Sequence, residues 1–279
     1  MGEPPDRCDP PPIMTNELQP SFPPVRVAVL GAGRLAWSLI PNLLRAGAEL
    51  RQLISRDEMR LREYAAQYAI PFTATQPEAI LPEINLIFLT VSDSALGDMA
   101  LRLKAHATPG CVCLHSSGSA PLSALAPFGG DAGVCYPLQM FTRDAVGDFL
   151  EIPLFVEGSE AFLHTWKPLF HALSGQVHAM NSEERLRLHM GAVMSNNFTN
   201  LLYRLAAENL PQSPGFEVYE ALVREHIRKV FAYQPGNTQT GPAVRGDLSV
   251  IRKHLELLSG QPDVQQLYEL MSDMIYKRR

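Results

Sequence analysis

Apolar residues in the first two thirds of the chain gather in short runs that alternate with amphipathic stretches. The runs carry few charges, which is typical of parallel strands covered by helices on both faces. The strands predicted in this way cover residues 25–30, 50–55, 85–91, 111–115, 133–136, 153–156 and 176–180, with a short strand near residue 72. This alternation of strands and helices indicates an α/β domain with a doubly wound, mostly parallel sheet.

The pattern changes near Asn181, after which no strand signal appears. Asn181 and Glu184 have the spacing of a capping box, and a helical pattern continues to about Leu210, which would make a helix roughly 45 Å long. Two or three more helices follow, over residues 217–233, 247–259 and 262–276. The sequence therefore predicts a sheet domain at 25–180 and an all-α C-terminal domain at 181–279.

The first 24 residues have a different composition, because eight of them are proline. Such a segment has few groups to bury, and we expect a disordered tail. It lacks the apolar core of a signal peptide, and no apolar run of the chain reaches the roughly 18–20 residues of a membrane span. The net charge of −5 disfavours a nucleic-acid partner.

The four cysteines lie at positions 8, 111, 113 and 135. Cys111, Cys113 and Cys135 fall on predicted strands, and no second cysteine pair or well-placed histidine completes a metal site. We interpret these three as core thiols of a reducing cytoplasm, whereas Cys8 lies in the tail.

A glycine motif follows the first predicted strand. Gly31 and Gly33 form G-x-G-x-x-A with Ala36, and a helix over residues 37–45 comes next. The first glycine allows a tight turn, the second lets a pyrophosphate approach the backbone, and the alanine lets the helix pack on the sheet. Free N–H groups at the helix start, near Arg34 and Leu35, would bind the pyrophosphate. The motif predicts an NAD(P)-binding Rossmann domain.

The second strand ends at Ser55 and Arg56, where NAD-preferring folds usually carry an acidic residue. A hydroxyl and a guanidinium suit a 2′-phosphate, so the sequence favours NADP(H), with NAD possible. The alternative is that Arg56 is a solvated charge and Asp57 binds the ribose. At the end of the strand over residues 85–91, Val91 and Ser92 are expected to line the cofactor, while Asp93 is either part of that site or a helix cap.

Candidate substrate residues follow the strand over residues 111–115, where His115 and Ser117 lie in a polar loop that could also be a plain turn. On the long helix, Arg185, His189, Asn196 and Asn200 have spacings of 4, 7 and 4, which place them on one stripe of an α-helix. Buried polar groups need partners, so this stripe is either a substrate site or a hydrogen-bonded packing seam.

A last cluster, residues 240–247, contains two glycines, a proline and Arg245 before Asp247. Thr240 and Arg245 could bind an anionic group, and Asp247 caps the helix that follows. The alternative is a connector between two helices.

At these residues the chain resembles a known family, the Rossmann-like proteins with an all-helical C-terminal domain of the DUF2520 type. The matching pieces are Gly31–Arg34, His115–Gly118, Tyr136–Gln139, Asn196–Phe198 and Thr240–Asp247. The family belongs to a group with 6-phosphogluconate and β-hydroxyacid dehydrogenases, ketopantoate reductases and pyrroline-5-carboxylate reductases. The resemblance implies an NAD(P)-dependent enzyme that dimerises through its helical domain.

One departure from the group concerns a lysine that its hydroxyacid and ketopantoate enzymes carry on the long helix. This chain has no lysine there, and His189 stands eight residues before Asn197. Because an imidazole titrates near neutral pH, His189 could replace the lysine as proton donor. Alternatively the acid is lost, and the protein binds NADP(H) without turnover.

The sequence thus favours an NADP(H)-dependent oxidoreductase that acts on a small carbonyl, hydroxy-acid or imine substrate. His189 is the candidate catalytic residue, and Ser117, Asn196 and Arg245 are candidate substrate ligands. The alternatives are a non-catalytic NADP(H)-binding or sensing protein and a structural dimer that the nucleotide only stabilises.

Overall fold

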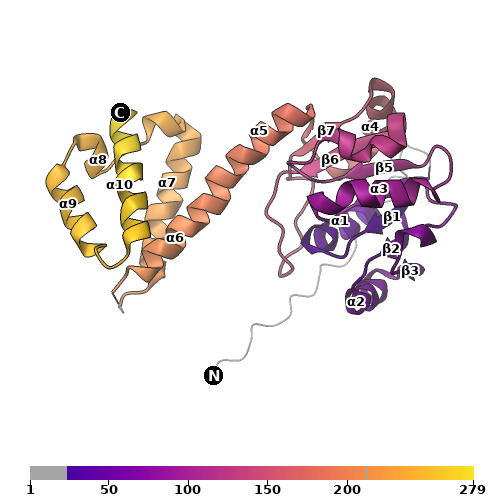
Figure 1. Cartoon of the computed structure of the whole chain (residues 1–279), viewed down its shortest axis with the longest axis horizontal. Helices are drawn as coiled ribbons and strands as arrows, with labels where there is room; N and C mark the ends of the chain where they lie inside the picture. Colours follow the sequence, from indigo (N-terminus) through magenta and orange to yellow (C-terminus); the bar gives the residue numbers. More distant parts are fainter. Residues whose placement is uncertain (1–23, 212) are drawn as a thin grey trace. The chain divides into compact units, whose positions relative to one another are not determined.

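The computed structural model of the chain describes residues 24–211 and 213–279. The predicted tail, with Cys8, therefore lies outside the described residues except for Pro24. The chain divides into two compact units, one up to Val193 and one from Met194 onward (Figure 1). The sequence places the domain boundary at residue 181, just before the helix Ser182–Ala192. The two units of the structure divide just after that helix.

In the part of the chain that the structure describes, eight strands form one sheet in the order β3-β2-β1-β4-β5-β6-β7-β8. The strands are β1 (Arg26–Leu30), β2 (Glu49–Ile54), β3 (Phe72–Ala74), β4 (Leu86–Leu89), β5 (Val112–His115), β6 (Ala132–Pro137), β7 (Leu154–Glu157) and β8 (Val177–Ala179). Neighbouring strands are parallel except for the antiparallel pair β6 and β7. The predicted doubly wound, mostly parallel sheet is confirmed.

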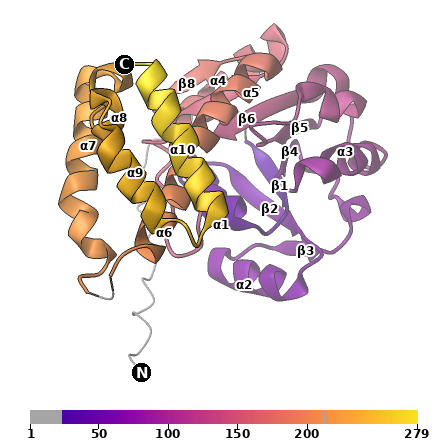
Figure 2. The same cartoon turned by 60° about the vertical axis from the view of Figure 1, so that its left-hand side comes forward.

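Helices cover both faces of this sheet because its strands are apolar on both sides. The helices of the unit are α1 (Arg34–Arg45), α2 (Glu58–Tyr68), α3 (Leu96–Lys104), α4 (Glu160–Leu173) and α5 (Ser182–Ala192). Side chains of α1, α2 and α4 pack in one core, and those of α3 and the 3₁₀ segment Leu122–Asp131 pack in another. Figure 2 shows α1 and α3 on opposite sides of the sheet. Cys111, Cys113 and Cys135 are buried free thiols, as predicted.

The helical stretch after Asn181 departs from the sequence prediction of one long α-helix. Asn181 forms the predicted capping box, in which its side chain accepts a hydrogen bond from the Glu184 N–H at 2.9 Å. A π-helical segment, Val193–Phe198, then separates α5 from α6 (Thr199–Glu208). Since π-helices hold more residues per turn, the 3.6-residue periodicity is interrupted there, and the predicted stripe from Arg185 to Asn200 does not continue across it.

The helical unit continues through three longer helices and one short one. They are α7 (Glu220–Tyr233), α8 (Pro242–Arg245), α9 (Leu248–Leu257) and α10 (Pro262–Lys277). Among the described residues of this unit, Ala243 alone is buried, while Phe231 is 85% and Leu257 80% exposed. A single chain therefore leaves much of the apolar surface of this unit uncovered. No helix in the described part of the chain has the length and hydropathy that a membrane span requires.

Candidate functional site

A tight turn joins β1 to α1, and its geometry depends on glycine. Gly31 has φ +106°, and a Cβ atom there would lie 2.7 Å from the carbonyl oxygen of Thr90. The Gly31 N–H donates to the carbonyl of Ile54 at 2.8 Å, which fixes the turn against β2. Gly33 is the N-cap of α1, and no side chain caps this helix. Its first N–H groups are thus left for an external acceptor.

A cavity of about 530 Å³ lies beside this turn. It brings together five of the residues predicted to bind a nucleotide, namely Gly31, Ser55, Arg56, Val91 and Ser92. The other three, Gly33, Arg34 and Leu35, lie at the start of α1 and outside its lining.

The same cavity has a wall that the sequence analysis missed. It is formed by side chains that follow β3 and by others on α3, among them Thr75, Gln76, Pro77, Met99 and Arg102. The signal that could have found the first three is their position just after a strand. Their approach to Arg56 depends on the pairing of β3 with β2, which no local pattern encodes.

Two charged residues follow β2, and only one of them is paired within the protein, which bears on the choice of ligand. Asp57 caps α2, since its carboxylate accepts from the Arg60 N–H at 3.1 Å and pairs with the Arg60 Nε at 3.1 Å. Ser55 Oγ accepts from the Asp57 N–H at 3.2 Å. Arg56 is exposed and has no hydrogen bond or ion pair with any described residue. The free charge at this edge is therefore the guanidinium of Arg56.

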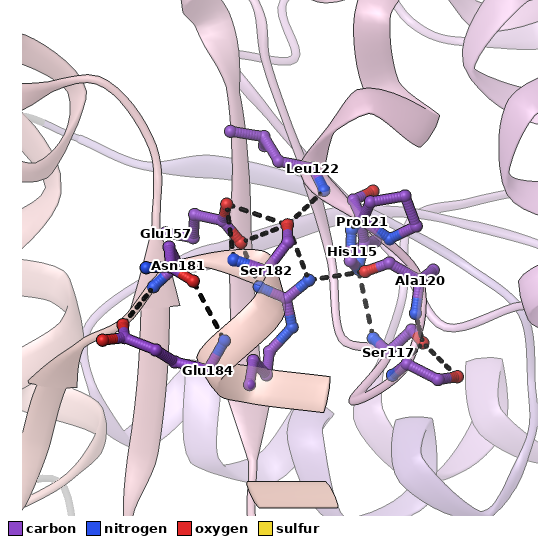
Figure 3. A network of polar contacts seen from close by, with 11 residues as sticks. His115, Ser117, Ala120, Pro121, Leu122, Glu157, Asn181, Ser182 and Glu184 are labelled. Atoms are coloured by element: carbon purple, nitrogen blue, oxygen red, sulfur yellow. Dashed lines mark hydrogen bonds and ion pairs between the residues drawn. The ribbon is translucent and has the colours of Figure 1, made fainter. Parts of the chain in front are cut away.

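The loop after β5 is built around a buried histidine. His115 Nδ1 accepts from the Ser117 N–H at 3.2 Å, so its Nε2 carries the proton and donates to the carbonyl of Pro121 at 3.3 Å (Figure 3). Burial, with a contribution from the nearby charge of Arg185, lowers the pKa of His115 to about 4. His115 is therefore neutral near pH 7 and shapes the loop, and it is not a proton donor at that pH.

Ser117 uses most of its hydrogen-bonding capacity within this loop. Its Oγ accepts from the N–H groups of Ser119 at 3.1 Å and Ala120 at 2.8 Å. Both lone pairs are then engaged. Because the Ser119 hydroxyl donates to Asp93, the Ser117 hydroxyl is the donor of its 3.4 Å contact with Ser119 Oγ. Ser119 in turn donates to the carboxylate of Asp93, which joins the loop after β5 to the one after β4.

His189 lies where three elements of the unit that ends at Val193 meet. From α5, its Nδ1 approaches the hydroxyl of Tyr136, the fifth residue of β6, at 3.0 Å, and the two rings meet edge to face. Gly118 in the loop after β5 covers the pair, because a Cβ atom there would lie 2.6 Å from His189 Nδ1 and 2.8 Å from Tyr136 Cζ. Only a glycine leaves room for this arrangement.

Arg185, one turn before His189, holds α5 on the sheet. Its side chain is 1% exposed and forms an ion pair with Glu157 at the end of β7. Its guanidinium also donates to the carbonyl of Ala120, and Ser182 Oγ donates to Glu157 Oε2 at 2.8 Å (Figure 3). Arg185 thus fixes the position of the helix that carries His189.

The remaining predicted ligands belong to the helical unit. Asn196 lies in the π-helical segment, and Arg245 is the exposed last residue of α8. The glycine-rich cluster around Arg245 forms a helix connector: Gly241 and Gly246 have φ values of +115° and +70°, and Asp247 caps α9. Among the described residues, no group of three or more His, Cys, Asp or Glu side chains has the arrangement of a metal site.

Comparisons with known proteins identify the family. Residues 152–275 match the family model described as a domain of unknown function, DUF2520, and residues 26–112 match that of the NADP oxidoreductases, coenzyme F420-dependent. The solved structure of BF3122 from Bacteroides fragilis, a protein assigned as an NADP oxidoreductase, is 35% identical in sequence. That match covers 91% of this chain and 98% of BF3122, with a TM-score of 0.81. The chain belongs to the same NADP oxidoreductase family as BF3122, and its C-terminal part carries the DUF2520 domain.

More distant structures share the fold of this DUF2520 protein. TM1727 from Thermotoga maritima is 20% identical, with 90% of this chain and 97% of that chain covered and a TM-score of 0.66. An imine reductase from Myxococcus stipitatus, solved in complex with NADP⁺, is 15% identical, with coverages of 90% and 92% and a TM-score of 0.62. No curated protein matches the chain in sequence.

The described residues of this DUF2520 protein fit the family's dinucleotide. The turn at Gly31 has no room for a side chain, and α1 begins at Gly33 without a side-chain cap, so the backbone there is open to a phosphate group. Ser55 and the unpaired charge of Arg56 are among the residues that line the adjoining cavity. A hydroxyl and a guanidinium are the donors that a 2′-phosphate requires.

Proposed function

We propose that the protein transfers a hydride between C4 of the nicotinamide of NADP(H) and a small carbonyl, hydroxy-acid or imine substrate, with His189 as the proton donor or acceptor. The observation that carries this proposal is the pairing of His189 with Tyr136 under Gly118. It lies in the unit that contains the glycine turn, next to the loop that follows β5. The nicotinamide, when bound, supplies or accepts the hydride.

The contact with Tyr136 determines which nitrogen of His189 is available. Nδ1 faces the phenol, so Nε2 is the nitrogen that remains for a substrate. Burial raises the pKa of Tyr136, so the phenol stays protonated and does not pass its proton on to His189. As the acid, His189 gives its Nε2 proton to the substrate while its Nδ1 stays in contact with the Tyr136 hydroxyl.

Three other residues are proposed as substrate ligands. Ser117 would exchange its long 3.4 Å contact with Ser119 for a hydrogen bond donated to a carbonyl or carboxylate oxygen of the substrate. Asn196 offers an amide, and Arg245 offers an exposed guanidinium that suits an anionic group. Each of these donors suits an oxygen-bearing group, and the identity of the substrate is left to a turnover screen.

We expect Arg56→Ala to weaken NADPH binding by about 1.5–3 kcal/mol, a factor of ten or more, because a charge-assisted contact to the 2′-phosphate is lost. NADH binding should stay the same. Calorimetric titration of both nucleotides measures the two affinities. The control is Arg62→Ala, which removes an exposed arginine of α2 that pairs with Glu58. Equal affinities of the wild type for NADPH and NADH would refute this assignment.

The partner proposed for the helical unit is a second copy of the chain. Apolar side chains are exposed along α5, the π-helical segment and α6, including Met190, Met194, Phe198 and Leu201. Contiguous apolar surface of this extent marks an interaction site.

The unpaired buried thiols of the sheet further support a cytoplasmic location.

Light scattering at micromolar concentration should therefore give the mass of a dimer. Phe198→Asp should shift the mass toward that of a monomer, because it places a charge in the proposed apolar surface, at a side chain that is 54% exposed. Met59→Asp is the matched control, since Met59 is 78% exposed on α2 of the other unit. A wild type that scatters as a monomer would argue against the dimer.

A turnover assay separates this proposal from its alternatives. NADPH oxidation screened against keto acids and cyclic imines should identify a substrate class. Tight binding without turnover would instead favour a non-catalytic NADP(H)-binding or sensing protein. Nucleotide binding that changes only the stability of the assembly would favour a structural dimer.

A further inference from the structure

Two side chains of α2 hold consecutive carbonyls of the glycine turn. Arg60 Nη1 donates to the carbonyl oxygen of Ala32 at 3.3 Å, and the Tyr64 hydroxyl donates to that of Gly33 at 2.9 Å. Arg60 and Tyr64 stand four residues apart, so they lie on the same face of α2. One face of this helix therefore reaches the turn at two successive peptide groups.

Because a peptide group is planar, a hydrogen bond that fixes its carbonyl also fixes the direction of its N–H. In a trans peptide the carbonyl and the N–H of the next residue point in opposite directions. The Gly33 carbonyl also accepts from the Trp37 N–H at 3.2 Å in the first turn of α1. With both carbonyls held from α2 as well, the N–H groups of Gly33 and Arg34 point away from α2. Within the described chain, neither N–H has a hydrogen-bond acceptor. They are the two donors at the start of α1 that a pyrophosphate needs.

The two side chains are themselves held in place. Tyr64 is fully buried and packs edge to face against Trp37 of α1, with 5.4 Å between the ring centroids. Burial raises the pKa of Tyr64 to about 12, so its hydroxyl keeps the proton that it donates. Arg60 is paired with Asp57 at 3.1 Å, which leaves it poorly suited to bind a phosphate directly.

We propose that Arg60 and Tyr64 are positioning residues, which orient the N–H groups of Gly33 and Arg34 toward the pyrophosphate of the dinucleotide. This inference rests on the nucleotide part of the proposed function and does not depend on His189 or on any substrate. It assigns to α2 a role that the glycine motif alone does not reveal. The role differs from that of Arg56, because a pyrophosphate is common to NADPH and NADH.

The test is the affinity of Tyr64→Phe for both nucleotides, measured by calorimetry. The ring and its packing on Trp37 stay, and only the hydroxyl is removed. We expect the Kd values of NADPH and NADH to rise by the same factor, about tenfold, as the loss of one hydrogen bond implies. Tyr68→Phe is the matched control: its hydroxyl accepts from Gln67 Nε2 at 3.2 Å and does not reach the turn. That variant should bind both nucleotides as the wild type does.

A second variant, at Arg60, tests whether the loss of affinity comes from the contacts to the turn and not from another effect of changing Tyr64. Arg60→Met keeps an unbranched side chain of similar length and should again weaken both nucleotides by a common factor. Thermal melting without nucleotide shows whether each variant is folded. Unchanged affinities in both folded variants, or a loss confined to NADPH, would overturn the proposal. If the wild type binds neither nucleotide, both this proposal and the cofactor assignment are wrong. If the variants lose affinity but the protein shows no turnover, the positioning role is supported and only the catalytic proposal fails.

Discussion

His189→Gln should lower kcat for reduction of the substrate by NADPH about 10²–10⁴-fold, which is the usual contribution of a general acid. The Kd for NADPH should stay nearly unchanged. Glutamine can still form a hydrogen bond to the Tyr136 hydroxyl, so the helix and the loop at Gly118 should keep their places. What is lost is a group that can release a proton.

The control for this prediction is His178→Gln. His178 is an exposed histidine of β8 that stacks on Phe155, and it does not approach Tyr136. Its substitution should leave kcat as it is. If His189 only packs the helix, His189→Gln will lower the melting temperature and spare the rate per folded molecule. That result would remove His189 from the chemistry.

Glu157→Ala should destabilise the nucleotide-binding unit by about 3–5 kcal/mol, because it leaves the buried charge of Arg185 without its partner. Arg185 is almost wholly inaccessible, and the same carboxylate also accepts from Ser182. Urea unfolding followed by tryptophan fluorescence measures the change, since Trp37 and Trp166, the only two tryptophans, both lie in this unit.

The matched control is Glu183→Ala, which breaks the ion pair with Arg187 on the same helix. Both side chains of that pair are about three-quarters exposed, at 75% and 76%, so the loss should be at most about 1 kcal/mol. A similarly small loss for Glu157→Ala would show that Arg185 does not hold α5 on the sheet.

The features of the fold that the sequence predicted are those encoded locally. The glycine turn at Gly31 could be predicted because strand, turn and helix follow one another along the chain. The capping box at Asn181 is likewise a pattern within four residues. The π-helical segment could not be predicted in this way, because the apolar periodicity on either side of it reads as one α-helix.

The candidate site was harder to predict because its contacts join distant segments. His189 and Tyr136 are 53 residues apart, and Gly118 meets both from a third element. The sequence marked His189 by its spacing on a helix, but nothing local paired it with a phenol. Arg185 was placed on the same stripe, and its burial against Glu157 follows from how α5 packs on the sheet.

The central claim is that hydride passes from NADPH to substrate carbon with His189 supplying the proton. The most direct measurement uses NADPH deuterated at C4, with mass spectrometry of the reduced keto acid or amine in wild type and His189→Gln. We expect deuterium at the reduced carbon in the wild type, and product formed at least about a hundredfold more slowly in the variant. A protein that binds NADPH yet forms no deuterated product from any keto acid or cyclic imine would contradict the account.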